Sequence, residues 1–167
     1  KHGAVRYSKK FGDIELRAGA ALQNNDVGLE EAGDVVDFGV KYSANNITLA
    51  AAMQSIAATE GTATSVAAGY EFSNGKANIT YSVTDEDYNG GAEQTGLLAQ
   101  VMVGKVYGFY GQTEFDGSDS TPNRIGLGYT HRINEAMVVW SELYQHDVDT
   151  DADDASLTWN VVGKIDF

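Results

Sequence analysis

The chain has 167 residues, a length that fits one domain, with 19 glycines, one proline and no cysteine. Without cysteine, neither disulfides nor a cysteine-based metal site can hold the fold together. A formal charge of −13 argues against nucleic acid as a partner, because phosphates require a basic surface.

The sequence predicts neither a transmembrane helix nor a signal peptide. No window approaches about 18 uninterrupted apolar residues, the length that a spanning helix needs. A membrane is not thereby excluded, because barrel strands hide their apolar residues in alternation. The opening Lys1-His2-Gly3 resembles the middle of a chain and carries no signal-peptide features.

Alternation with a period of two residues runs through most of the chain and predicts an all-β fold. In 34–43, for example, Val36, Phe38 and Val40 alternate with Asp37 and Gly39. A short helix is the alternative only in the alanine-rich stretch 49–58. The predicted strands are 3–10, 13–22, 34–43, 46–57, 63–73, 75–84, 95–103, 105–115, 123–131, 136–146 and 156–167.

The connections between these strands alternate between short turns and long acidic loops. Asn74-Gly75 is a strong signal for a two-residue hairpin. Tight turns on one side and long loops on the other are typical of an up-and-down barrel in the outer membrane. The short turns lie near 10–12, 44–46, 74–75, 104–105 and 133–135, and the long loops near 23–33, 58–62, 85–94, 116–122 and 147–155.

The final segment, 157–167, carries the most specific pattern. Leu157, Trp159, Val161 and Ile165 fall on one face of a strand, and the chain ends on an aromatic residue, Phe167. Its length matches the roughly 9–11 residues with which a tilted strand crosses a bilayer. This segment predicts a location in the outer membrane.

Aromatic residues gather near both ends of the predicted strands, as expected for girdles that anchor a barrel at the two membrane interfaces. The alternative is that strands simply favour aromatic residues. Those near a short turn or the chain end are Tyr7, Tyr42, Phe72, Tyr107, Tyr129 and Phe167; those toward the long loops are Tyr88, Phe115, Tyr144 and Trp159.

The direction of the strands can be counted from the last one. If Phe167 ends on the periplasmic side, the first of eleven strands starts outside the cell. Single-chain bacterial barrels have even strand numbers, with both termini normally in the periplasm. We therefore expect residues 1–167 to form a single barrel domain that lacks N-terminal strands.

Four segments resemble the general diffusion porins of Gram-negative bacteria, and most closely the acidic porins of the alphaproteobacterial type. They are 46–52 (NITLAAA), 65–72 (SVAAGYEF), 124–129 (RIGLGY) and the ending 162–167 (VGKIDF). The resemblance implies an antiparallel transmembrane β-barrel of sixteen strands, a homotrimer, and a third loop that folds inward to narrow each pore. If Phe167 closes the sixteenth strand, that loop lies in sequence absent from this chain.

The polar face of each strand is predicted to line a pore. Charges of both signs across a water-filled lumen create a transverse field that biases ion passage. The alternative is that they only keep the interior wet. Arg6, Arg17 and Arg124 are the strongest candidates, because guanidinium groups stay charged at any pH. The full predicted set is Arg6, Glu15, Arg17, Asp37, Lys41, Glu71, Gln100, Gln112, Glu114, Arg124 and Lys164.

The long loops are rich in carboxylates, above all in 147–154. Asp147, Asp149 and Asp151 match the first, third and fifth positions of a calcium loop, and Asp153 follows. Because Ala152 and Thr158 replace the required glycine and glutamate, an EF-hand is not expected. Weak divalent binding that bridges to lipopolysaccharide phosphates is one reading, with possible structural Ca²⁺, and a solvated acidic rim is the other.

The sequence gives little sign of catalysis and predicts no enzyme and no cofactor. His2, His131 and His146 fall on different strands, and no nucleophile elbow or metal-ligand pair occurs. We therefore predict a passive channel for small hydrophilic solutes and ions, in contact with outer-membrane lipid. The alternatives are a substrate-specific barrel or adhesin, and a soluble acidic β-sandwich that acts as a binding module.

Overall fold

Alternating apolar and polar residues produce strands throughout the chain. The computed structural model describes residues 2–23, 35–57, 59–88, 91–118, 121–133, 137–147 and 156–165, with side chains except at 2–3, 22–23, 137 and 163–165. The strands are β1 (His2–Phe11), β2 (Ile14–Gln23), β3 (Val35–Ala44), β4 (Ile47–Ile56), β5 (Gly61–Phe72), β6 (Gly75–Thr84), β7 (Gln94–Val103), β8 (Val106–Phe115), β9 (Asn123–Arg132), β10 (Met137–Asp147) and β11 (Ser156–Ile165).

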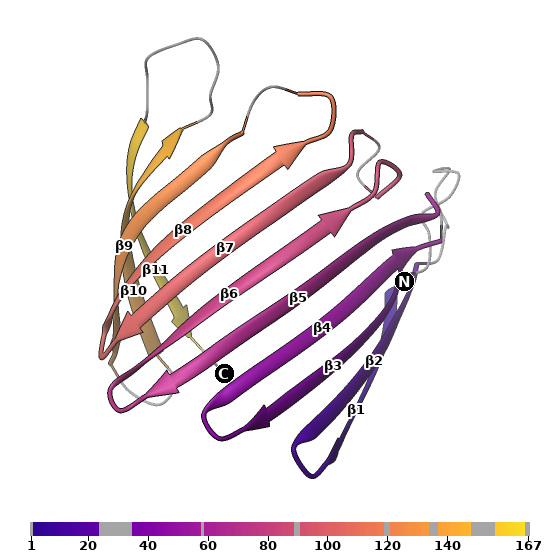
Figure 1. Cartoon of the computed structure of the whole chain (residues 1–167), viewed down its shortest axis with the longest axis horizontal. Coiled ribbons are helices and arrows are strands. Elements are labelled where there is room, and N and C mark those ends of the chain that lie inside the picture. The colour runs from indigo at the N-terminus through magenta and orange to yellow at the C-terminus, as the bar shows by residue number, and fades with distance from the viewer. Residues whose placement is uncertain are drawn as a thin grey trace.

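These strands form one antiparallel sheet in which each strand pairs with its neighbours in sequence, from β1 to β11. The sheet curves, so that β9–β11 and β1–β3 are seen nearly edge-on while the central strands face the viewer (Figure 1). The predicted strands, including the alanine-rich β4, and the all-β up-and-down fold are confirmed. No helix in the described part of the chain is long and apolar enough to cross a membrane.

The described turns between β1 and β2, β3 and β4, β5 and β6, and β7 and β8 lie at one edge of the sheet, opposite the described residues that follow β6 and β8 (Figure 1). Asn45 and Asn46 both adopt positive φ, 51° and 67°, as a type I′ hairpin turn requires. The Asn74-Gly75 turn is placed one residue too late by the sequence prediction, because Phe72 pairs with Gly75 and leaves Ser73 and Asn74 as the turn residues. A Cβ at Gly75 would collide with the Phe72 ring, so this glycine serves close packing.

Cross-strand register sorts the side chains onto two faces. One carries Val5, Phe38 and Leu49 and is called the apolar face here; the other carries Arg6, Asp37 and Thr48 and is called the polar face. Directly paired residues share a face, as Phe38 and Met53 do between β3 and β4. The predicted period-two alternation therefore extends into a continuous surface over all eleven strands.

Burial runs opposite to the pattern of a water-soluble protein. The apolar face is exposed, with Leu127 at 64% and Trp159 at 71% of their maximal accessible area. Among the residues described, Tyr107 is the one buried hydrophobic side chain, and it lies on the polar face. Soluble monomers rarely expose apolar patches of more than a few hundred Å². The sheet therefore has no apolar core of its own, and the soluble β-sandwich alternative fails.

Adjacent residues in the middle of β5 provide a test of the two faces. Val66 lies on the apolar face and Ala67 on the polar face. We expect Val66→Arg to lower the free energy of unfolding in lipid vesicles by about 2–4 kcal/mol, because the guanidinium would enter hydrocarbon. Ala67→Arg should cost far less, since its side chain would point into water. Equal losses in a urea titration of the two variants would contradict the face assignment.

Candidate functional site

The polar face brings most of the predicted pore-lining residues onto one continuous surface. On this face, Arg6, Gly19 and Asp37 share one cross-strand row, and the second row beyond it joins Glu15 to Lys41. Lys164 is paired with Val138 through the backbone, and its side chain lies outside the description. The predicted residues on the polar face are Arg6, Glu15, Arg17, Asp37, Lys41, Glu71, Gln100 and Arg124.

Two of the predicted residues, Gln112 and Glu114, lie on the apolar face instead. Gln112 pairs with Leu97, and its side-chain oxygen accepts a hydrogen bond from the Tyr110 hydroxyl at 2.8 Å. Its amide in turn donates to Glu114 Oε1 at 2.9 Å. The apolar face becomes polar toward the long-loop end of β8, so residue type alone misled the prediction for these two positions.

The first group of charges on the polar face spans β1, β2 and β3. Glu15 Oε1 accepts hydrogen bonds from the Ser8 hydroxyl at 2.9 Å and from Arg17 Nε at 2.8 Å. Arg17 remains 62% exposed, so the ion pair adds little stability. The ion pair matters for position, because it holds the Arg17 guanidinium next to Glu15 on the polar face.

A glycine sets the spacing within this first group. Gly19 is buried between Arg6 and Asp37 in the same cross-strand row. A Cβ at Gly19 would collide with the Asp37 carboxylate. The missing side chain thus lets Asp37 lie across β2 toward β1, where opposite charges face each other along the wall.

The polar face of the central strands is small and nearly neutral. Across the described β4–β7, its only charged residues are Glu71 and Lys76, which pair next to the short turn between β5 and β6. Alanine, serine and threonine fill many of the remaining positions, such as Ala52, Ser65 and Thr80. The charges therefore concentrate in two separate groups, on β1–β3 and on β9–β10.

The second group centres on Arg124 of β9. Its guanidinium carbon lies 4.0 Å from the centroid of the Tyr144 ring and 5.4 Å from that of Phe109. Arg124 Nη2 lies 3.9 Å from Glu142 Oε2, and the Tyr107 hydroxyl donates to Glu142 Oε1 at 2.6 Å. The cation thus lies over aromatic rings, beside a carboxylate that has a second hydrogen-bond partner.

Two glycines of β9 allow these rings to lie close to the wall. A Cβ at Gly126 would come within 2.6 Å of both the Phe109 ring and Tyr144 Cβ. A Cβ at Gly128 would collide with the Tyr107 ring. Aromatic residues from β8 and β10 thereby cover a strand that has no side chains of its own at these rows.

The position of Tyr107 corrects a sequence prediction. Tyr107 was expected among the membrane-anchoring aromatics, but it is only 7% exposed and pairs with Gly128 on the polar face. Tyr144 and Phe115 also fall on the polar face by register. Sequence reasoning missed Glu142 and Phe109 altogether. The Gly126-x-Gly128 spacing, between strands with aromatic residues at matching heights, was the available signal.

The other predicted anchors lie on the apolar face. Tyr7, Tyr42, Phe72 and Tyr129 pair there with apolar or small residues near the short-turn edge. Trp159 lies on the same face toward the long loops, where its indole Nε1 donates to Ser141 Oγ at 2.7 Å. Phe167 lies outside the described residues. An anchoring role for all of these remains a prediction.

Comparison with known families identifies the chain. The model of the Gram-negative porin family matches residues 2–151. This chain belongs to that family. The predicted resemblance is therefore confirmed, and the location of a Gram-negative porin is the outer membrane. No curated protein matches the chain by sequence.

Solved structures of a porin share the fold. Three mutants of the porin of Rhodopseudomonas blastica, an alphaproteobacterium, have TM-scores of 0.64, 0.64 and 0.63 at 15%, 17% and 18% sequence identity. Each alignment covers 99% of this chain and 55% of the solved one. The chain thus spans little more than half the length of the porins it matches.

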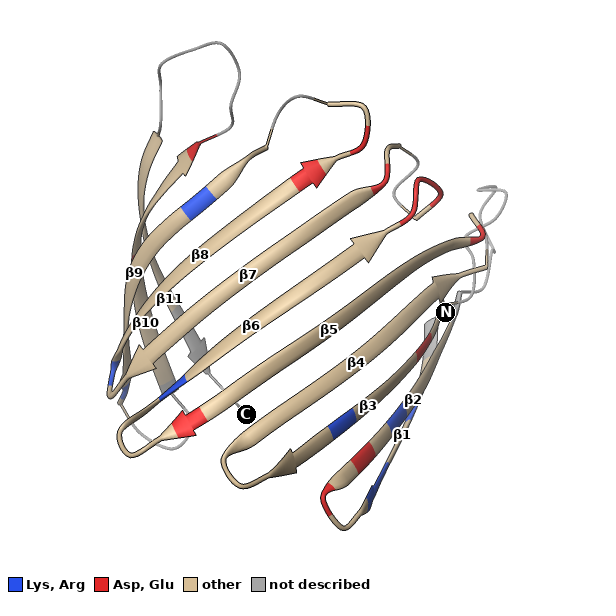
Figure 2. Cartoon of the chain, viewed as in Figure 1, with Lys and Arg blue, Asp and Glu red and all other residues tan. Residues whose placement is uncertain are grey.

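Several acidic residues of this porin-family chain gather at the long-loop edge of the sheet, while others lie on β2, on β3 and at the short-turn end of β5 (Figure 2). Among these residues, the Asp85 carboxylate accepts three hydrogen bonds. Its Oδ2 accepts from the Thr62 amide at 2.7 Å and from the Thr62 hydroxyl at 2.5 Å, and its Oδ1 accepts from the Tyr88 amide at 2.9 Å. These donors, the Thr62 hydroxyl first, lower the pKa of the Asp85 carboxyl below its ordinary value of 3.8.

The predicted divalent-ion site falls mostly outside the described residues. Asp149, Asp151 and Asp153 lie there, and Asp147 ends β10. No group of three or more His, Asp or Glu side chains that could hold a metal occurs among the residues described. Divalent binding at 147–153 stays a prediction.

The Asp85 contacts predict how the loop after β6 responds to pH. The pKa of Asp85 is lower in the folded state than in the unfolded chain. The stability that its hydrogen bonds contribute is therefore fully present above about pH 4, and it is lost as pH falls through that lower pKa. Asp85→Asn removes the charge and should expose residues 85–93 to protease at pH 7. The control Asp87→Asn removes a neighbouring charge and should leave cleavage unchanged. Equal cleavage of the two variants would contradict this role.

Proposed function

We propose that this chain forms the wall of a passive, water-filled channel for small hydrophilic solutes and ions. The two-faced sheet is the observation that supports this most strongly: an exposed apolar face for lipid, and a polar face with charges of both signs. In this proposal solutes pass by size and by electrostatic bias, without energy input, cofactor or catalysis.

Lipid imposes a further requirement on the sheet. Every backbone polar group within the hydrocarbon must be satisfied, so a transmembrane sheet has to close. In the described chain, β1 and β11 are each paired on one side only. We therefore place the sheet in the wall of a closed barrel, and the family resemblance favours sixteen strands.

The proposed partners follow from the surfaces. A homotrimer is proposed from the family. The small residues Ala18, Ala20, Ala51 and Ala68 on the apolar face would suit close packing of subunits, and they would equally suit contact with lipid. The remaining apolar face would contact lipid. The acidic loop edge would contact lipopolysaccharide, with divalent ions bridging carboxylates such as Asp147 to its phosphates.

The three arginines of the polar face are proposed to set ion selectivity. Replacing Arg6, Arg17 and Arg124 together with glutamine leaves Glu15 and Glu142 without their cationic partners. We expect the reversal potential of reconstituted channels in a KCl gradient to shift toward greater cation preference, because three fixed positive charges leave the lumen wall.

Lys9 supplies the control for this experiment. It lies on the apolar face, over the Phe11 ring at 5.2 Å, so Lys9→Gln removes a cation that does not line the lumen. The reversal potential of the Lys9→Gln channel should match that of the unmodified channel. An unchanged potential in the triple variant would refute the proposed role, and an absence of any ion conductance would refute the channel itself.

A further inference from the structure

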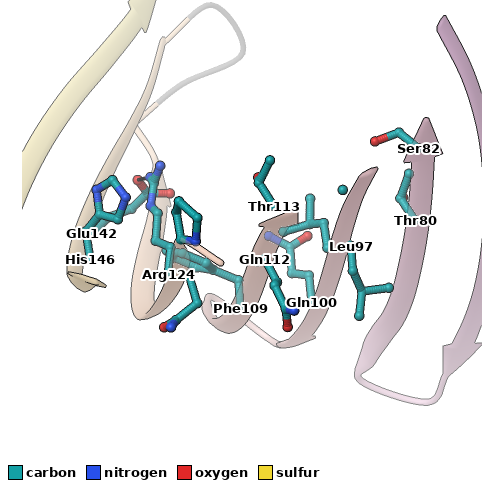
Figure 3. Close-up of a pocket in the computed structure, with 15 residues that line it drawn as sticks. Thr80, Ser82, Leu97, Gln100, Phe109, Gln112, Thr113, Arg124, Glu142 and His146 are labelled. Atoms are coloured by element: carbon teal, nitrogen blue, oxygen red, sulfur yellow. Dashed lines mark ion pairs between the residues drawn. The ribbon is translucent and has the colours of Figure 1, made fainter. Parts of the chain in front are cut away.

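The polar face contains a hollow of about 620 Å³ between β6 and β10. Arg124, Glu142 and His146 lie at one side of this hollow, and Thr80 and Ser82 lie at the other (Figure 3). Its volume falls within the ~300–1,000 Å³ of ordinary small-molecule sites. The hollow lies within the lumen wall, where every passing solute would meet it.

Two glycines, Gly96 and Gly111, line the hollow. Gly111 lies in one cross-strand row between Leu98 and Arg124, and Gly96 lies beside Ser82. A Cβ at Gly111 would have the Leu98 methyl at 3.7 Å, an ordinary contact, as its nearest neighbour. The space above Gly111 is therefore not needed for packing within the sheet.

The charges at the hollow nearly cancel. Arg124 and Glu142 lie 3.9 Å apart, and the other lining residues, apart from the titratable His146, are uncharged. Net charge thus gives little advantage to an anion or to a cation. The pair still offers directional hydrogen bonding: a guanidinium with donors fixed in one plane, and a carboxylate that accepts.

The uncharged lining offers a mixed polar and apolar surface. Gln100 contributes an amide that both donates and accepts, and Thr80 and Thr113 contribute hydroxyls. Phe109 and Leu98 add apolar surface beside them. A sugar ring has this same combination, with hydroxyls around its rim and C–H groups on its faces.

We propose that this hollow is a weak binding subsite for a neutral sugar of one or two rings. The proposal rests on the channel function proposed above and narrows it, because solutes of this class would be retained at the wall during passage. The contact of Arg124 with the Tyr144 and Phe109 rings supports it, since a donor that is already oriented loses less freedom when a ligand binds.

The test compares Gly111→Val with Gly69→Val in the intact protein, reconstituted in planar bilayers. Gly69 also lies on the polar face, outside the hollow, and a Cβ there would meet its nearest atom at an ordinary 3.6 Å. Each channel is measured in KCl and then titrated with maltose. We expect maltose to reduce the current of the Gly69→Val channel as it reduces that of the unmodified channel. For the Gly111→Val channel, the maltose concentration that gives half of the maximal reduction should be about tenfold higher.

Different outcomes refute different claims. Absence of conductance in KCl refutes the channel, whereas conductance without any effect of maltose refutes the subsite alone. Equal half-saturation in the two glycine variants also refutes the subsite. If a polyethylene glycol of similar size blocks all variants as maltose does, the block reflects excluded volume alone and the subsite is refuted. Stronger block by the anion gluconate than by maltose would contradict the proposal that the ligand is a neutral sugar.

Discussion

The antiparallel hydrogen-bond ladder is the constraint on which the rest of this structure depends. It fixes which residues face each other from β1 to β11, and a slip of one residue would move every side chain of a strand to the other face. Because apolar residues dominate the middle of one face, such a slip would put Val66 or Leu127 in water and Arg17 or Arg124 in lipid. The polar wall is therefore a consequence of register.

Glycine shapes that wall as much as the charged residues do. At Gly19, Gly126 and Gly128, the missing side chain gives space to a carboxylate or to an aromatic ring from the next strand. At Gly111 the missing side chain is not replaced, and a hollow remains beside Arg124. The same residue type thus produces a packed arginine–aromatic cluster and, one strand away, an open surface where a solute could rest.

Period-two alternation was enough to predict the fold, because each strand repeats the pattern and turn residues separate the repeats. The same reasoning placed Arg6, Arg17 and Asp37 on the polar face. It failed at Tyr107, Gln112 and Glu114, where residue type and face disagree. A tyrosine packs over Gly128 on the polar face, and two polar residues lie on the apolar face at the long-loop end of β8. The face on which such a residue lies follows only from its pairing with residues of the neighbouring strands. The sequence of a single strand does not contain that information.

The central claim, water on one face and lipid on the other, is best tested by cysteine scanning of β5. The sequence has no cysteine, so each introduced thiol is the only one. In the reconstituted protein, a membrane-impermeant thiol reagent should label positions 63, 65, 67 and 69 quickly, and 64, 66, 68 and 70 slowly or not at all. Uniform labelling along β5, or fast labelling of the second set alone, would contradict the account.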